Sequence, residues 1–198
     1  MSERWVLVFY RAPTEPSSAR VTAWRRLHRL GALYVGPSAC LISARLQAEA
    51  KVAQVAADLR QAGGELDAYV VESFAAAAEA DIEARYNQAR DAEYAELIER
   101  SQGVVGELES EGARGKFTFA EVEENEADIA KLRRWLRRIQ SRDLFGARSR
   151  EAAQAAIETA QAKLNIFVKI ASAREDQSIL VLSDEKLAPE RDPTRSPI

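Results

Sequence analysis

The stretch WVLVFY, residues 5–10, decides the fold of the first part of this chain. Six consecutive apolar residues rich in β-branched and aromatic types indicate a strand buried on both faces of a sheet. The next stretch, APTEPSSA at 12–19, contains two prolines and two serines, which mark a turn and the start of a helix. A buried strand needs partners, so the remaining strands are expected in the residues that follow.

Glycines divide those residues into short segments. Gly31 follows a run with helical spacing, at the position where a left-handed residue ends a helix. Gly36-Pro37 separates two short β-like runs and is typical of a hairpin turn. Gly63-Gly64 ends a second helical run. The expected elements are helices over 17–30 and 45–62 and strands over 32–35, 39–43 and 65–74. The order βαββαβ predicts a ferredoxin-like unit over residues 1–74.

The remainder of the chain has the pattern of long helices. We expect three of them in residues 75–175, over 76–109, 118–142 and 150–172, joined by short loops as in a helical bundle. Thr118 and Glu121 have the spacing of a capping box. Residues 176–198 end in a proline-rich, charged stretch and are expected to form a mobile tail. The fold class predicted is therefore α+β, a ferredoxin-like unit followed by a helical bundle.

Composition excludes several kinds of site. With one cysteine, Cys40, and one histidine, His28, the chain lacks the ligands for zinc or iron–sulfur centres, so we expect neither metal nor cofactor. Cys40 lies in a short apolar run and is expected to be a buried small hydrophobe. No stretch is long and apolar enough to span a membrane, and the first residues do not resemble a secretory signal. We expect a cytoplasmic protein that does not bind membranes.

The net charge of −3 is unevenly distributed. Residues 1–62 carry a net +5, 63–130 a net −13, and 131–150 a net +7. Two clusters account for the positive segments: Arg25, Arg26 and Arg29 in the first expected helix, and Arg133, Arg134, Arg137, Arg138 and Arg142 near the end of the fourth. Arginines three and four residues apart share a helix face.

Two interpretations of these clusters remain open. Guanidinium groups match phosphate and other tetrahedral oxyanions, so the clusters could bind a nucleic-acid backbone. Charge runs are also commonly solvated or salt-bridged faces. The acidic half of the same helix, before Lys131, could pair with the arginines. A helix with acidic residues in its first half and basic residues in its last half also suits the helix dipole. Trp5, Trp24 and Trp135 are expected in the core or at an interface.

Three blocks of the sequence resemble the chromate-resistance regulator family ChrB, in its N-terminal domain. They are WVLVFYRAPTEPSSARVTAWRRLHRLGALYVG at 5–36, ARDAEYAEL at 89–97, and GKFTFAEVEENEADIAKLRRWLRRIQSRDLFGA at 115–147. The first block is also similar to the middle domain of the phenylacetate repressor PaaX, which implies the ferredoxin-like fold. Typical members continue into a second domain of over a hundred residues, and this chain ends at Ile198.

The resemblance implies a transcriptional regulator that binds promoter DNA and responds to chromate or a related oxyanion, as a homodimer. The two arginine clusters, including Arg142, are then the candidate DNA contacts. Arg11, Arg20 and His28 are the candidate oxyanion ligands. An alternative is a non-catalytic oxyanion sensor or protein adaptor without DNA binding. No enzyme is expected, because a lone thiol cannot cycle between redox states and the first strand ends without the acidic residue that a metal-dependent nuclease of this fold uses.

Overall fold

The computed structural model describes residues 3–15 and 17–187. The chain divides into two compact units. The first contains the residues up to 95 together with 137–151, and the second contains 96–136 and the residues from 152 onward. The first unit is therefore built from two separate stretches of sequence. None of the helices within the described residues combines the length and apolar character that a bilayer crossing requires.

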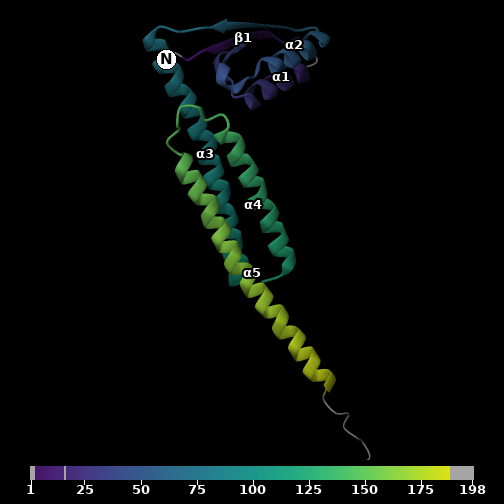
Figure 1. The fold of residues 1–198 in the computed structure, drawn as a ribbon. Helices are drawn as coiled ribbons and strands as arrows, with labels where there is room; N and C mark the ends of the chain where they lie inside the picture. Colours follow the sequence, from purple (N-terminus) through teal and green to yellow (C-terminus); the bar gives the residue numbers. More distant parts are fainter. Residues whose placement is uncertain (1–2, 16, 188–198) are drawn as a thin grey trace, which may run out of the picture. The chain divides into compact units, whose positions relative to one another are not determined.

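The first unit contains a four-stranded antiparallel sheet in the order β2-β3-β1-β4. Its strands are β1 (Trp5–Arg11), β2 (Leu33–Gly36), β3 (Ala39–Ser43) and β4 (Glu65–Val71). Helices α1 (Ser17–Arg29) and α2 (Glu49–Gln61) lie on the same side of it (Figure 1). The predicted βαββαβ order is confirmed. One boundary was wrong, because a 3-10 turn over Ala44–Leu46 and a left-handed Gln47 delay the start of α2.

Both faces of β1 are covered at its first residues. Val6 and Val8 pack against α1 and α2, while Trp5 packs on the opposite face against Tyr86 of α3 (Ala76–Ala113). Further along, Phe9 is 47% exposed. Among the aromatic rings that the structure describes, it meets only that of Tyr69, in an edge-to-face arrangement. The prediction of a strand buried on both faces thus holds for the first half of β1 and fails at Phe9.

The inward face of α1 is formed by a small and a large apolar residue. Ala23 and Leu27 are buried against the sheet, whereas Val21 and Trp24 are exposed, Trp24 by 45%. Val21 and Trp24 thus face outward, although Leu27 on the same helix faces the sheet. Of the two expected places for Trp24, the core is excluded, and an interface stays a prediction. Trp5 is buried as expected, and Trp135 is half-buried.

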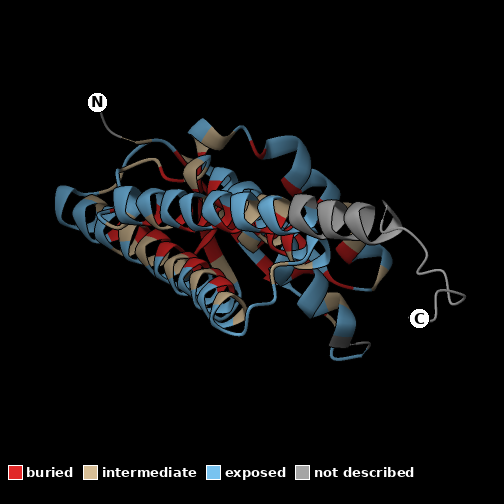
Figure 2. Cartoon of the chain, turned by 90° about the horizontal axis from the view of Figure 1, so that it is seen from below, coloured by how far each residue is buried: buried red, intermediate tan, exposed pale blue. Residues whose placement is uncertain are grey.

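The second unit is formed by parts of three long helices, α3, α4 (Phe119–Gln140) and α5 (Arg150–Leu187). Buried residues line one side of each helix and exposed residues the other (Figure 2). Thr118 Oγ1 accepts from the Glu121 N–H at 3.3 Å, which confirms the hydroxyl half of the capping box. The predicted end of α5 near Ser172 was wrong, because no glycine or proline interrupts the chain before Pro189. Residues 188–198 of the expected tail lie outside the described residues.

Gly64 directly precedes β4 and lies close to the backbone of β1. A Cβ there would lie 2.6 Å from the Arg11 carbonyl oxygen and 2.9 Å from Leu59 Cγ. Gly64→Ala is therefore expected to lower the free energy of unfolding by about 2 kcal/mol, in the range typical of overpacking. Urea unfolding followed by circular dichroism measures this change.

Gly103 provides the matched control. It lies within α3, and a Cβ at that position would meet nothing within 4 Å. Gly103→Ala should raise the free energy of unfolding by about 0.5–1 kcal/mol, because alanine is the better helix former. Equal effects of the two substitutions would contradict the crowding inferred at Gly64.

Cys40 is fully buried in β3, as expected for a small hydrophobe. Burial raises the pKa of its thiol to about 12. Since the thiolate is the reactive species, native protein at pH 8 should not react with an aromatic disulfide reagent, while urea-unfolded protein should release one equivalent. Rapid reaction of the native protein would show that the thiol is accessible after all.

Candidate nucleic-acid interface

The three arginines of the first cluster, Arg25, Arg26 and Arg29 on α1, divide into one that is paired within the fold and two that are free. Arg26 forms an ion pair with Asp58 of α2, whose carboxylate also accepts from Gln54. Arg25 and Arg29 are exposed on the same helix. Among side chains that the structure describes, neither has an ion-pair partner. Their donors are therefore open to an external anion.

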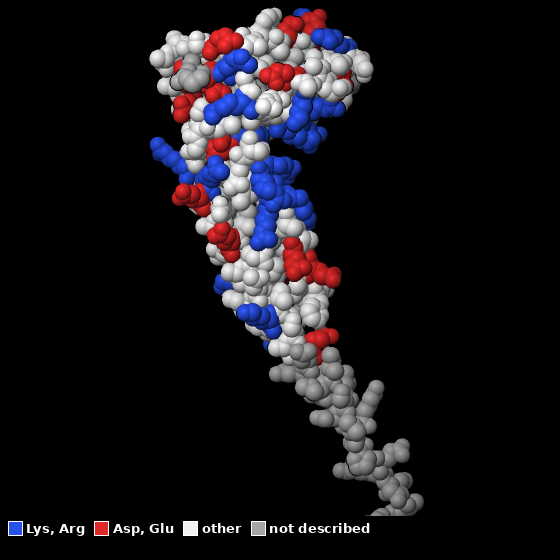
Figure 3. Space-filling view, viewed as in Figure 1, with Lys and Arg blue, Asp and Glu red and all other residues white. Residues whose placement is uncertain are grey.

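The second cluster lies along the last turns of α4. Arg133, Arg134, Arg137 and Arg138 are exposed, and within the described side chains none is ion-paired. The acidic half of the helix thus does not neutralise them, although Lys131 pairs with Asp128 at 2.7 Å. Figure 3 shows the acidic and basic atoms separated along this helix. A narrow apolar stripe on the same helix is buried: Ile129, Leu132, Leu136 and Ile139.

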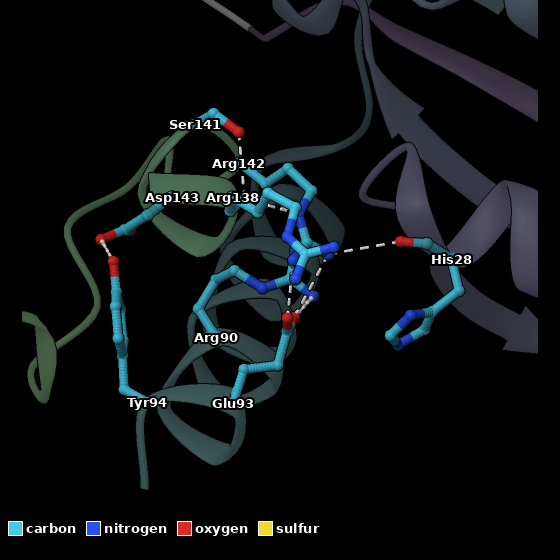
Figure 4. A network of polar contacts seen from close by, with 8 residues as sticks. All are labelled: His28, Arg90, Glu93, Tyr94, Arg138, Ser141, Arg142 and Asp143. Carbon is cyan, nitrogen blue, oxygen red and sulfur yellow. Dashed lines mark hydrogen bonds and ion pairs between the residues drawn. The ribbon is translucent and has the colours of Figure 1, made fainter. Parts of the chain in front are cut away.

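Arg142 differs from the other arginines of its cluster. Its side chain is 11% exposed and donates to Glu93 Oε2 from NH2 at 2.6 Å. It also donates from NH1 to the His28 carbonyl oxygen at 3.3 Å and from Nε to the Arg138 carbonyl oxygen at 2.9 Å (Figure 4). Arg142 therefore joins the end of α1, the segment after α4, and α3, all within the first unit.

Arg90 of α3 shares the same carboxylate. Its side chain is 2% exposed, and its NH2 lies 2.6 Å from Glu93 Oε1. The guanidinium carbon lies 5.2 Å from the centre of the Tyr86 ring. Sequence reasoning did not single out Arg90, because Arg90 and Glu93 are three residues apart and look like an ordinary exposed pair of a helix. Only the return of the chain at Arg142 encloses them.

The turn that carries Arg142 is held by its neighbour, Asp143. The buried Asp143 carboxylate accepts from the Tyr94 hydroxyl at 3.0 Å and from the N–H groups of Gly146 and Ala147 at 3.1 and 2.9 Å. Burial and this hydrogen bond raise the pKa of Tyr94. These contacts fix the backbone next to Arg142 and so orient its guanidinium toward Glu93.

His28 lies half-buried at the edge of this network. Its ring stacks on Trp24, with centroids 5.2 Å apart. Burial lowers the pKa of His28, and the positive charges of Arg142 and Arg90 lower it further against the opposing effect of Glu93. His28 is therefore neutral at pH 7 and adds no positive charge to the cluster.

The other two predicted oxyanion ligands lie elsewhere in the first unit. Arg11, at the end of β1, pairs with Glu65 of β4, and this partner raises the pKa of the guanidinium. Arg20 is exposed on α1. No hydrogen bond or ion pair between described residues connects either one to His28. Nor do the described residues include a group of three His, Cys, Asp or Glu placed to hold a metal ion.

Comparison with known proteins identifies the family. A family model described as "Protein ChrB, N-terminal" matches residues 20–177, which include both arginine clusters and the network around Glu93. Searches of curated proteins and of solved structures found no match. Because the family model covers most of the chain, this protein belongs to the ChrB N-terminal domain family, which is associated with chromate resistance.

Proposed function

We propose that this chain is the DNA-binding module of a transcriptional regulator of chromate resistance. The observation that supports this most directly is the set of exposed arginines on α1 and α4 that have no ion-pair partner among the described side chains. An arginine already paired, such as Arg26, would have to give up a carboxylate before it could bind phosphate. Arg25, Arg29, Arg137 and Arg138 would lose only hydration and counterions.

The local arrangement matters more than the net charge of −3. At physiological salt the Debye length is about 8 Å, so acidic groups farther than this from a phosphate at the arginines are largely screened from it. Each guanidinium can donate to two phosphate oxygens in a planar fork. Inside the first unit, Arg142 donates to backbone carbonyls at the ends of α1 and α4, so the helix ends that carry Arg29 and Arg138 lie close together.

The proposal includes a homodimer on promoter DNA and a cytoplasmic role without catalysis. The fully buried Cys40 and the neutral, half-buried His28 support the absence of catalysis, since neither is placed as a nucleophile beside a base. An oxyanion bound at the guanidinium groups would compete with phosphate and release DNA, because a ligand shifts an equilibrium toward the state that it binds better.

Substitution of the exposed arginines tests DNA binding. Arg137→Gln/Arg138→Gln and Arg25→Gln/Arg29→Gln should each weaken binding to the DNA upstream of the gene. Each pair should also reduce the slope of log K against log salt by about 1.8, if each arginine neutralises one phosphate at about 0.9 per contact. Fluorescence anisotropy at a series of salt concentrations gives both quantities.

Arg100→Gln is the matched control, since Arg100 is an exposed helix arginine that already pairs with Glu96 at 3.8 Å. It should leave affinity and slope unchanged. Absence of binding at low salt for the unmodified chain, with and without chromate, would refute the proposal. If Arg100→Gln lowered the affinity as much as either double substitution, only the total charge would matter.

A second candidate function is a non-catalytic oxyanion sensor or protein adaptor that does not bind DNA. The buried Arg90 supports it, because this guanidinium faces the interior and cannot reach a DNA backbone. Calorimetry with sulfate and chromate, combined with the DNA titration, separates the two. Oxyanion binding without DNA binding would favour the sensor.

A further inference from the structure

Trp24 is the largest apolar side chain that α1 leaves outside the core. It is 45% exposed, and Val21, one turn earlier, is 42% exposed. Single apolar residues on a surface are common, but tryptophan is highly buried on average in folded proteins. A half-exposed indole therefore asks what its neighbours on the helix could bind together with it.

The ring of Trp24 is held in a defined orientation. It stacks on the imidazole of His28, with ring centroids 5.2 Å apart and ring planes 25° apart. The backbone under this stack is tied at two points. The Tyr34 hydroxyl donates to the Trp24 carbonyl oxygen at 3.4 Å, and Arg142 NH1 donates to the His28 carbonyl oxygen at 3.3 Å (Figure 4). The stack covers one face of the indole, and much of the remaining side chain is open to solvent.

Positive side chains flank this ring on the same helix. Arg20, Trp24 and His28 are four residues apart and lie along one side of α1, and Arg25 and Arg29 form the next row around it. Arg25 and Arg29 have no ion-pair partner among the described side chains, and α1 contains no acidic residue. A partner that fits this surface should therefore carry negative charge next to a flat apolar group.

A nucleotide combines these two properties. Its phosphate accepts from a guanidinium fork, and its base has a flat face that stacks on aromatic side chains. A base placed on the open face of Trp24 would extend the indole–imidazole stack by one ring. An acidic peptide would satisfy the arginines but would leave this stack unextended, so a nucleic acid matches the surface better.

We propose that Trp24 is a base-stacking residue, which receives an unstacked DNA base on its open face while Arg25 and Arg29 hold the neighbouring phosphates. The inference rests on the proposed function and adds the state of the DNA that this helix binds. Bases inside a duplex already stack on one another, so the indole reaches a base face only where a base step is opened.

An opened step has a consequence for the sequences that are bound. Stacking tolerates any base, since every base has a flat face. Preference then comes from how easily a step opens, and pyrimidine–purine steps such as TA and CA are the most easily unstacked. Trp24 thus selects for deformable DNA, whereas the arginines beside it contact phosphates and carry no sequence information.

Fluorescence anisotropy of the full chain with the duplex upstream of the gene, and with one strand of that duplex alone, tests the inference. Trp24→Ala should weaken single-strand binding about tenfold, within the range measured for one base–aromatic stack. It should weaken duplex binding by a smaller factor, because opening the step offsets part of the stacking. The slope of log K against log salt should not change, since the indole carries no charge. Trp24→Phe keeps a flat ring and should lose less. Val21→Ala is the control and should change nothing.

Tryptophan fluorescence gives a second readout. Trp5 is buried and Trp135 half-buried, so both contribute background. Stacking of a base on Trp24 should quench the emission of the unmodified chain, and Trp24→Phe should remove this quenching.

Equal affinities of Trp24→Ala and Val21→Ala for both DNA forms would overturn the inference, as would quenching that persists in Trp24→Phe. An effect on the single strand alone would overturn the opened step in the duplex. Sedimentation velocity without DNA tests the competing occupant, because dissociation of an oligomer by Trp24→Ala would assign the ring to a protein interface. DNA binding that does not depend on Trp24 refutes this inference alone, whereas absence of binding by the unmodified chain refutes the proposed function with it.

Discussion

The carboxylate of Glu93 is the interaction on which the first unit depends. It is the meeting point of α3 with the segment that returns after α4, and Arg142, which it binds, also holds the end of α1. Removing one member of a buried ion pair costs more than the pair itself contributes, since it leaves an uncompensated charge. The ends of α1 and α4, which carry exposed arginines, are therefore held together from the inside, around a carboxylate side chain that is only 17% exposed.

Much of the fold follows from local pattern. Steric restrictions favour one local conformation for each of three features: the apolar run of β1, the glycines at 31 and 63, and the Gly36-Pro37 turn. All three were placed correctly. Errors arose where tertiary contact decides. Nothing in the spacing of Val21 and Trp24 shows that Ala23 would face the sheet, and nothing in the apolar run 5–10 shows that Phe9 would be exposed while Trp5 is covered.

The site was predictable only in part, for a similar reason. Exposed arginines at helical spacing can be recognised in the sequence, because their number and phase are local properties. The buried Arg90 shares Glu93 with Arg142, which lies more than fifty residues further along, and a charge three residues from its partner looks like a surface pair until that segment is in place. Whether the arginines bind DNA or an oxyanion is a property of ligands and stays a prediction.

The divided sequence of the first unit has a consequence for how the protein is made. Phe145 stacks on Trp5 at 6.0 Å, and residues 137–151 complete a core whose sheet is encoded before residue 72. During synthesis the sheet strands leave the ribosome well before the segment that covers Trp5, Tyr86 and Arg90. At about 5–20 residues per second, this interval lasts several seconds. During it, the apolar face around Trp5 and Tyr86 and the charge of Arg90 are both exposed to water. The nascent chain thus passes through a stage in which it is vulnerable to association with other chains, and any shortened version that ends before residue 151 would remain in that stage.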